Sequence, residues 1–262
     1  MGRSRQSYYK AVDRAKQETI DSMSLMKLVQ PIRRIMPRLG GRKLHFMLQS
    51  SLEENALKIG RDRFFRWLRT HQLLVRPKRS YIRTTRSNHR FRVYNNLTVG
   101  FNLNSPNQIW VSDITYLRTL KGFCYLALIT DAFSRKIVGY DVSDSLELDG
   151  CLRALQRALG SVSNPSNIIH HSDRGFQYCS NPYTDLLKSQ GVRISMAAKG
   201  NCYENALAER VNGILKDEFN LDVTFENLAQ AAKAVHQSVY LYNQQRPHWS
   251  INLLTPYEKH AA

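Results

Sequence analysis

Three acidic residues of this chain stand where a carboxylate is unexpected. Asp113 interrupts the alternating stretch WVSDITYL, Asp173 follows the apolar run NIIHHS, and Glu209 lies in the helix-like segment YENALAERVNGILKDEF. Aspartate is a poor strand former and is costly to bury alone. Carboxylates that converge need a counter-charge, and Mg²⁺, which prefers oxygen ligands, supplies one. Although each acid taken singly reads as a cap or a solvated residue, together they predict a site for two Mg²⁺ ions that serves in-line phosphoryl transfer.

The choice of Glu209 rests on the two stripes of its predicted helix. At 100° per residue the apolar stripe should face a core, and the polar stripe should face away from it. The apolar stripe comprises Leu207, Val211, Ile214 and Leu215. The polar stripe comprises Asn205, Glu209, Asn212 and Lys216. Glu209 lies in the middle of the polar stripe and can project from the packed helix toward another group, and we expect its neighbours Asn205 and Asn212 to contact DNA.

The elements that must position these acids follow in the order β-β-β-α-β-α-β-α-α from residue 106 onwards. Strands are predicted near 107–117, 123–133, 136–145, 167–172 and 192–197, from alternating or continuous apolar runs. Helices are predicted at 147–160, 181–190, 203–219 and 225–244, followed by an irregular tail. This order predicts an α/β fold over residues 106–262, with a mixed sheet flanked by helices.

The first 75 residues predict a small helical DNA-binding region. A helix is expected from Ser22 to about residue 39, kinked or broken by Pro31 and Pro37, and two more are expected over 41–55 and 61–74. Two helices joined by a glycine-bearing break, the second of them basic, are typical of a helix-turn-helix. The arginines expected to meet phosphates and base edges are Arg61, Arg63, Arg66 and Arg69.

The charge of the chain is divided unevenly along its length. Of the net charge of +17, all lies in residues 1–105, which hold 23 Lys and Arg against 6 Asp and Glu, whereas residues 106–262 hold 15 of each. Such a division favours a polyanion-binding module joined to a neutral one over a generally basic surface. Residues 76–105 begin with a basic stretch expected to follow a DNA backbone rather than to act as a plain tether. Its predicted contacts are Arg76, Lys78, Arg79, Arg83 and Arg86.

Several other classes of protein are disfavoured. No apolar run approaches the ~20 residues of a membrane span, and the N-terminus lacks an apolar signal core, so we expect a cytoplasmic protein. The four cysteines form no C-x-x-C pair, which disfavours a disulfide framework. A zinc site of His170, His171, Cys179 and Cys202 fits none of the usual spacings.

At these residues the chain resembles the DDE transposases of the insertion-sequence-three family, in the product of its second reading frame. The interval of 35 residues between Asp173 and Glu209 is that of DDE transposases and retroviral integrases. The matching stretches are WVSDITYL, HHSDRGFQYCS, KGNCYENALAERVNGILKDEF and YNQQRPHWSINLLTPYE. The resemblance implies a ribonuclease-H-like core, a metal-binding triad of Asp113, Asp173 and Glu209, and a DNA contact by Lys216. It also implies Mg²⁺ or Mn²⁺ as cofactor and association with the bacterial nucleoid.

The activity that the resemblance implies is cleavage of one DNA strand at an insertion-sequence end and transfer of the freed 3′-hydroxyl to another phosphodiester. Two alternatives stay open: a catalytically silent relative that only binds DNA ends, and a nuclease of the same fold that cuts without joining. One active site holds one phosphodiester, so we expect a homodimer or larger assembly on paired ends, with an upstream-frame partner or fusion in addition. Phe176 and Cys179 depart from the family, which favours a smaller residue and a threonine at these positions.

Overall fold

The computed structural model describes residues 5–76, 91–198 and 205–262, in two compact units, Met1–Lys78 and Arg79–Ala262. The predicted DNA contacts Lys78, Arg79, Arg83 and Arg86 lie outside the described residues. No helix within the described ranges is both long enough and apolar enough to span a membrane.

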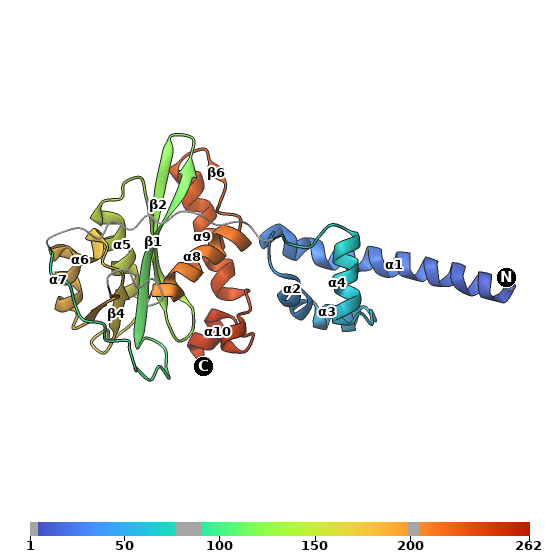
Figure 1. Cartoon of the computed structure of the whole chain (residues 1–262), viewed down its shortest axis with the longest axis horizontal. Coiled ribbons are helices and arrows are strands. Elements are labelled where there is room, and N and C mark those ends of the chain that lie inside the picture. Colours follow the sequence, from blue (N-terminus) through green and yellow to red (C-terminus); the bar gives the residue numbers. More distant parts are fainter. Residues whose placement is uncertain (1–4, 77–90, 199–204) are drawn as a thin grey trace. The chain divides into compact units, whose positions relative to one another are not determined.

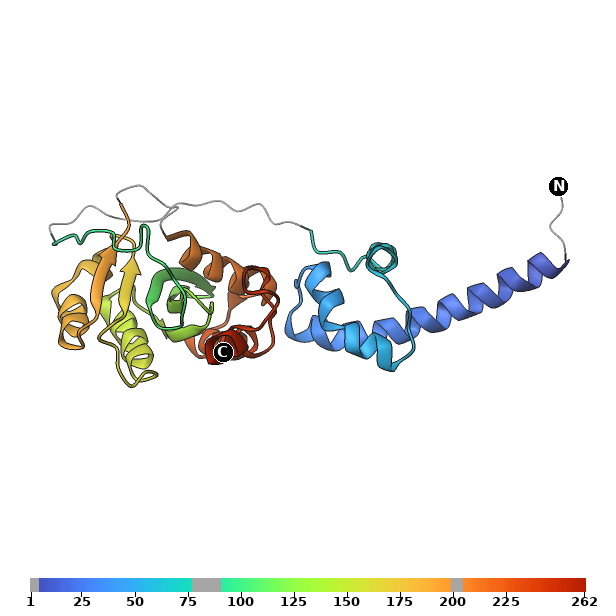
Figure 2. The same cartoon turned by 90° about the horizontal axis from the view of Figure 1, so that it is seen from below.

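The N-terminal unit consists of one long helix and three short ones packed against its C-terminal half (Figures 1 and 2). These are α1 (Arg5–Ile35), α2 (Gly41–Met47), α3 (Gln49–Glu54) and α4 (Arg61–Thr70). Leu25 and Val29 are the buried residues of α1, and the core is completed by Leu44, Leu48, Leu52, Phe64 and Leu68 from the other helices.

The predicted helices of this unit need two corrections. The first helix begins at Arg5 instead of Ser22 and continues through Pro31, because burial of the flanking Val29 and Met36 offsets the hydrogen bond that a proline cannot make. It ends at Ile35, two residues before Pro37. The single helix expected over 41–55 is two helices, α2 and α3, that meet at Leu48.

The second unit is built on a six-stranded sheet whose order is β3-β2-β1-β4-β5, with β6 pairing with β1. The strands β1, β2 and β3 form an antiparallel meander, while β4, β5 and β6 are joined by parallel pairings. Their bounds are Ile109–Thr119 (β1), Gly122–Asp131 (β2), Ile137–Ser143 (β3), Ile169–Ser172 (β4), Arg193–Met196 (β5) and Thr224–Phe225 (β6). The five main strands fall where the apolar runs predict them.

Helices cover both faces of this sheet, which confirms the predicted α/β class (Figure 1). One face carries α5 (Leu148–Leu159), α6 (Phe176–Cys179) and α7 (Asn181–Ser189). The other carries α8 (Ala206–Glu218), α9 (Leu228–Gln244) and α10 (Pro256–Ala261). Alternation along β1 supplies both cores: Trp110 joins the cluster with α5 and α7, whereas Val111 packs with Ala208 of α8.

Two segments are more ordered than their composition suggests. The tail expected to be irregular contains a 3₁₀ turn, Trp249–Ile251, and the helix α10, whose N-terminus is closed by a capping box between Thr255 and Glu258. Residues 91–105, expected to belong to the basic linker, pack on the second unit. The backbone N–H of Leu97 donates to Ser195 Oγ at 2.8 Å, and Phe101 and Leu103 join the cluster under α8.

Candidate active site

The sheet brings Asp113 and Asp173 to the same level. β1 and β4 are parallel neighbours in which Ser112 is opposite Ser172, so the two aspartates directly follow a matched pair. Asp113 lies inside β1, whereas Asp173 comes immediately after the end of β4. Asp173 Oδ1 accepts a hydrogen bond from the backbone N–H of Gly175 at 2.9 Å, which orients its carboxylate at the strand end.

Two asparagines fasten α8 to this part of β1. Asn212 Nδ2 donates to Asp113 Oδ2 at 2.8 Å, and Asn205 Nδ2 donates to the backbone oxygen of Ser112 at 3.2 Å. Both asparagines are buried. We expected them to contact DNA, but buried side chains that bond β1 cannot do so, and we therefore assign them to positioning Asp113.

The electrostatic surroundings of Asp113 are those of a crowded acidic site. Burial raises its pKa to about 7, and the negative charges of Asp173 and, more weakly, Glu209 act in the same direction. The hydrogen bonds from Asn212 and from the backbone of Ile114 lower the pKa without reversing the shift. Asp113 therefore experiences both of the other predicted carboxylates.

Asp131, a fully buried aspartate at the end of β2, is an example of a structural carboxylate in this fold, in contrast to the partly exposed Asp113. Its oxygens accept hydrogen bonds from the backbone N–H of Asn107 at 2.8 Å, and from the backbone N–H and the hydroxyl of Ser134 at 2.7 and 2.6 Å. Burial acts to raise the pKa of Asp131, but these bonds and His260 outweigh it and hold the pKa below its usual value. The charge of Asp131 is thus satisfied by the protein, whereas that of Asp113 is opposed by it.

Glu209 lies on α8 between the two asparagines, and Lys216 lies one turn after Asn212. Glu209 is exposed and Lys216 is half-buried. Burial lowers the pKa of Lys216, while Asp222 and Asp113 act to raise it, so the ammonium group is within electrostatic range of the site. Asp113 therefore lies within electrostatic range of Asp173, Glu209 and Lys216.

The donor set fits a hard divalent cation. Asp113 and Asp173 offer carboxylate oxygens from adjacent strands, and positive charge placed there would relieve the repulsion that raises the pKa of Asp113. The buried Oδ1 atoms of Asn205 and Asn212 have no hydrogen-bond partner among the described residues, as expected beside a hydrated ion. As the described side chains stand, no three His, Cys, Asp or Glu residues are close enough to hold a metal, so Glu209 would complete the set only around the ion.

Sequence reasoning missed the buried support beneath the aspartates. His170 Nε2 lies 2.7 Å from Ser112 Oγ and 3.0 Å from the Tyr183 hydroxyl, and burial together with His171 lowers its pKa to about 3. His171 Nδ1 lies 2.8 Å from Ser195 Oγ. These hydrogen bonds tie β1, β4, β5 and α7 together directly below the two acids, and the paired histidines in HHSD were their only sequence signal.

The two departures from the family pattern have structural partners. The ring of Phe176 packs edge-on against Phe91, with centroids 5.3 Å apart. A smaller side chain at position 176 would lose this contact with the first described residue of the second unit. Cys179 is buried, with Sγ 3.6 Å from Met196 Sδ at the end of β5. Both contacts support the loop that follows Asp173.

The predicted DNA-binding arginines of α4 are on its exposed side. Arg66 is two residues from Phe64 and from Leu68, and it therefore points away from the core. Arg63 pairs with Asp21 of α1 at 3.2 Å, and Arg61 pairs with its neighbour Asp62 at 2.9 Å. Arg69, the fourth of them, is exposed, as is Arg76 in the segment after α4.

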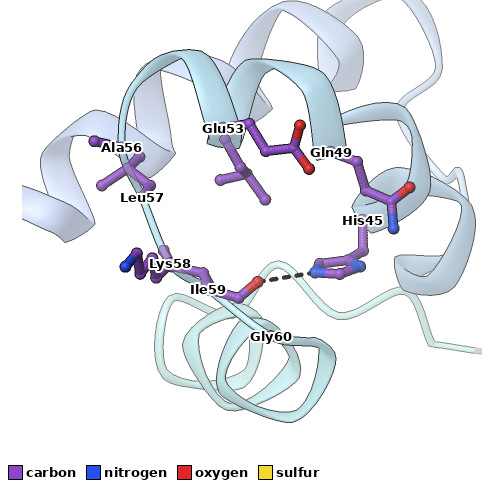
Figure 3. A pocket seen from close by; sticks show the side chains of 9 residues that line it. His45, Gln49, Glu53, Ala56, Leu57, Lys58, Ile59 and Gly60 are labelled. Atoms are coloured by element: carbon purple, nitrogen blue, oxygen red, sulfur yellow. Dashed lines mark hydrogen bonds between the residues drawn. The ribbon is translucent and has the colours of Figure 1, made fainter.

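A pocket of about 570 Å³ lies beside the break that precedes α4, lined by residues of α2 and α3 and by Ala56–Gly60 (Figure 3). His45 Nε2 donates to the backbone oxygen of Ile59 across it, at 3.0 Å. None of the predicted site residues lines this pocket. Its contacts instead fix the turn between the helices.

Comparison with known proteins places the chain among mobile-element proteins. Two family models, both described as an integrase core domain, match residues 104–202 and 190–256. The insertion element IS600 uncharacterized 31 kDa protein of Shigella sonnei is 36% identical over 259 residues, covering 97% of this chain and 94% of that protein. The transposase InsF for insertion sequence IS3A of Escherichia coli K12 is 41% identical over 152 residues, which are 58% of this chain and only 53% of that relative.

A solved structure agrees with this result at the level of the fold. The cryo-EM structure of a simian T-cell lymphotropic virus intasome in complex with PP2A regulatory subunit B56 gamma matches with a TM-score of 0.51 and 19% identity, over 85% of this chain and 75% of that one. The mixed sheet with its flanking helices is therefore the ribonuclease-H-like integrase core. Together with the near-complete match to the IS600 protein, these findings confirm that the chain belongs to the insertion-sequence-three family of DDE transposases, the DNA transposases of insertion sequences.

Proposed function

We propose that this transposase cleaves DNA at the ends of its insertion sequence and joins the freed ends to a target, through Asp113, Asp173 and Glu209. The observation that carries the proposal is the placement of Asp113 and Asp173 directly after the paired Ser112 and Ser172 of adjacent strands, with α8 bonded to Asp113 through Asn212. The raised pKa of Asp113, due to burial and the charges of Asp173 and Glu209, agrees with it. Three carboxylates in one neighbourhood suit a Mg²⁺ or Mn²⁺ site better than a purely structural role.

The chemistry consists of two displacements at phosphorus. A water oxygen attacks the scissile phosphodiester and the bond to the 3′-oxygen breaks, which leaves a 3′-hydroxyl; this oxygen then attacks a target phosphodiester and displaces another 3′-oxygen. Bound divalent cations, two per site, would activate the attacking oxygen and neutralise charge on the leaving one. Asn212 holds the carboxylate of Asp113 in place, and Lys216 supplies a cation for a DNA phosphate near the site.

The N-terminal unit would bring the DNA to this site. The exposed arginines of α4 and the basic stretch from Arg76 to Arg86 suit a duplex end, while residues 106–262 carry no net charge. The protein would bind the ends of its insertion sequence and a target DNA. It would act as a homodimer or larger assembly on paired ends, with an upstream-frame partner or fusion in addition. A transposon has two ends, and a symmetric pair of chains provides one active site for each.

The test is an assay with the full chain, paired terminal-repeat DNA of its own element, and Mg²⁺. We expect strand-transfer products that disappear when EDTA is added. Nicks without joined products would favour the nuclease alternative, and end binding without cleavage would favour the silent relative. Either of these outcomes contradicts the proposal.

A second expectation concerns Arg66. Replacing it with alanine should weaken DNA binding about threefold to tenfold and reduce the slope of log affinity against log salt by about one, because one phosphate contact is lost. Fluorescence anisotropy over a salt series measures both quantities. Lys233→Ala, an exposed cation on α9, is the control and should leave both unchanged; equal effects of the two substitutions would show that only overall charge matters.

A further inference from the structure

The β1–β2 hairpin extends beyond the active site. β4 ends at Ser172, opposite Ser112, whereas β1 continues to Thr119. Residues 114–119 are paired with β2 along one edge, and only Arg118 and Thr119 also pair with β6. At ~3.3 Å per residue this arm reaches ~20 Å past Asp113. Figure 1 shows the two strands running together to their turn.

One face of the arm is a cluster of aromatic rings, formed by Tyr116, Phe123 and Tyr125. Tyr116 is directly opposite Tyr125, and Phe123 is opposite Arg118, so all four side chains point to the same face. The ring of Tyr116 lies 5.2 Å from that of Tyr125 and 6.1 Å from that of Phe123, between centroids. Phe123 is 54% exposed, which is unusual for a phenylalanine in a sheet.

Basic residues border the aromatic cluster at the turn end of the arm, and an acidic residue lies near its opposite border. Arg118 and Lys121 are exposed at the turn end of the arm, and Arg118 is close enough to Lys216 to act on its pKa. At the opposite border, Tyr125 lines a narrow cleft together with Leu146 and Glu147. A polyanion on this face would therefore place its phosphates toward Arg118 and Lys121.

The cluster also borders the loop that carries Asp173. Gln177 Nε2 donates to the backbone oxygen of Leu146 at 2.6 Å, which links the segment after Asp173 to the cleft beside Tyr125. Tyr116 is three residues from Asp113 along β1, or ~10 Å, so strand alternation turns its ring to the face opposite the Asp113 carboxylate. Within the described residues, positions 114–117 of β1 pair with β2 alone, and a DNA strand would reach the rings from the acids around this open edge.

We propose that Tyr116, Phe123 and Tyr125 form a stacking platform for unpaired bases at the DNA end. Exposed aromatic rings on neighbouring strands, with cations at their border, are the chemistry by which sheets bind single-stranded nucleic acid. Paired bases hide their faces in the duplex, so the occupant is a locally opened end. This inference rests on the proposed function, since it assumes that DNA ends reach Asp113.

The test uses the full chain and terminal-repeat DNA with 2-aminopurine at the end. In EDTA, we expect binding of the unaltered protein to change the fluorescence of the probe, and we expect Phe123→Ala and Tyr116→Ala to abolish this change. In Mg²⁺, each variant should cleave paired ends about tenfold more slowly. The rate should recover on ends that are already unpaired, and Phe123→Trp should keep the platform.

Controls separate the inference from its alternatives. Tyr240→Ala removes an aromatic ring of similar exposure from α9, and it should change neither the fluorescence nor the rate. The inference is overturned if binding of both platform variants changes the probe fluorescence as much as binding of the unaltered protein does. It is also overturned if the variants lose the oligomer in light scattering while the fluorescence change persists, which would mark a protein-docking face. A normal fluorescence change without cleavage by the unaltered protein would refute the proposed function and leave the platform supported.

Discussion

Asp113→Asn is expected to abolish strand cleavage and, at the same time, to stabilise the metal-free protein. Loss of one charged ligand removes several kcal/mol of transition-state stabilisation, so the cleavage rate in Mg²⁺ should fall ~10³-fold or more. The amide oxygen of the variant can still accept the hydrogen bond that Asn212 donates to Asp113, whereas its NH2 group cannot accept the one from the backbone N–H of Ile114. The link to α8 is therefore kept while the charge is removed.

The stability gain follows from the pKa of Asp113, which is raised from 3.8 to about 7. As the pH rises from about 4 to about 7, the unfolded chain loses this proton while the folded chain keeps it, so the stability of the unaltered protein falls over this window. Above about pH 7 this stability has been lost in full. Allowing for the partial exposure of the side chain, the variant should gain on the order of 2 kcal/mol near pH 8, and clearly less near pH 5.

Differential scanning calorimetry of the two proteins in EDTA measures this gain as a rise of roughly 4–8 °C in Tm near pH 8. Mg²⁺ should raise the Tm of the unaltered protein and leave that of the variant nearly unchanged. Asp185→Asn, an exposed acid of α7, is the control for loss of one charge. A variant that keeps its cleavage activity, or is less stable than the parent near pH 8, would remove Asp113 from the proposed site.

The second large effect concerns a largely buried ion pair, in which the side chain of Glu218 is 13% exposed. Arg246, whose side chain is 2% exposed, donates from Nε and Nη2 to the two oxygens of Glu218, both at 2.8 Å. Glu218 is the last residue of α8, and Arg246 lies two residues after the end of α9. The pair therefore links two helices that cover the same face of the sheet. Removing one partner leaves the other charge buried without its counter-ion.

Arg246→Met should lower the free energy of unfolding by about 3–5 kcal/mol, or the Tm by roughly 10 °C. Because α8 carries Glu209, cleavage should weaken as well. The double variant Arg246→Met/Glu218→Met should recover part of the loss, since neither charge is then left alone. Lys188→Met, in the exposed pair with Asp185, is the matched control and should cost less than about 1 kcal/mol. Chemical denaturation measures these free energies of unfolding. If Arg246→Met and Lys188→Met lower the free energy of unfolding by the same amount, the buried pair has no special role.

Local patterns in the sequence were sufficient for most elements of the fold and for the choice of acids. Alternation over a few residues predicts β1, and the 3.6-residue period predicts the buried side of α8, because both depend on neighbours along the chain. The basic first part of the chain is likewise visible as composition. The first half of α1 is missing from the prediction because it is exposed and so has no apolar stripe to read. The helix α10 was missed although its capping box, Thr255 and Glu258, is present in the sequence.

Only the tertiary structure decided what the polar residues of α8 do. A helical wheel puts Asn205 and Asn212 on the polar stripe with Glu209, but two of these three side chains are buried. Their burial depends on finding acceptors on β1, the backbone oxygen of Ser112 and the carboxylate of Asp113, about a hundred residues away in the chain. The position of Asp173 next to Asp113 likewise depends on a distant pairing, the register of β4 against β1. The sequence determined which residues could do chemistry, whereas pairings between distant segments decided which of them meet, because the free energy of burying a polar group is set by the partner it finds.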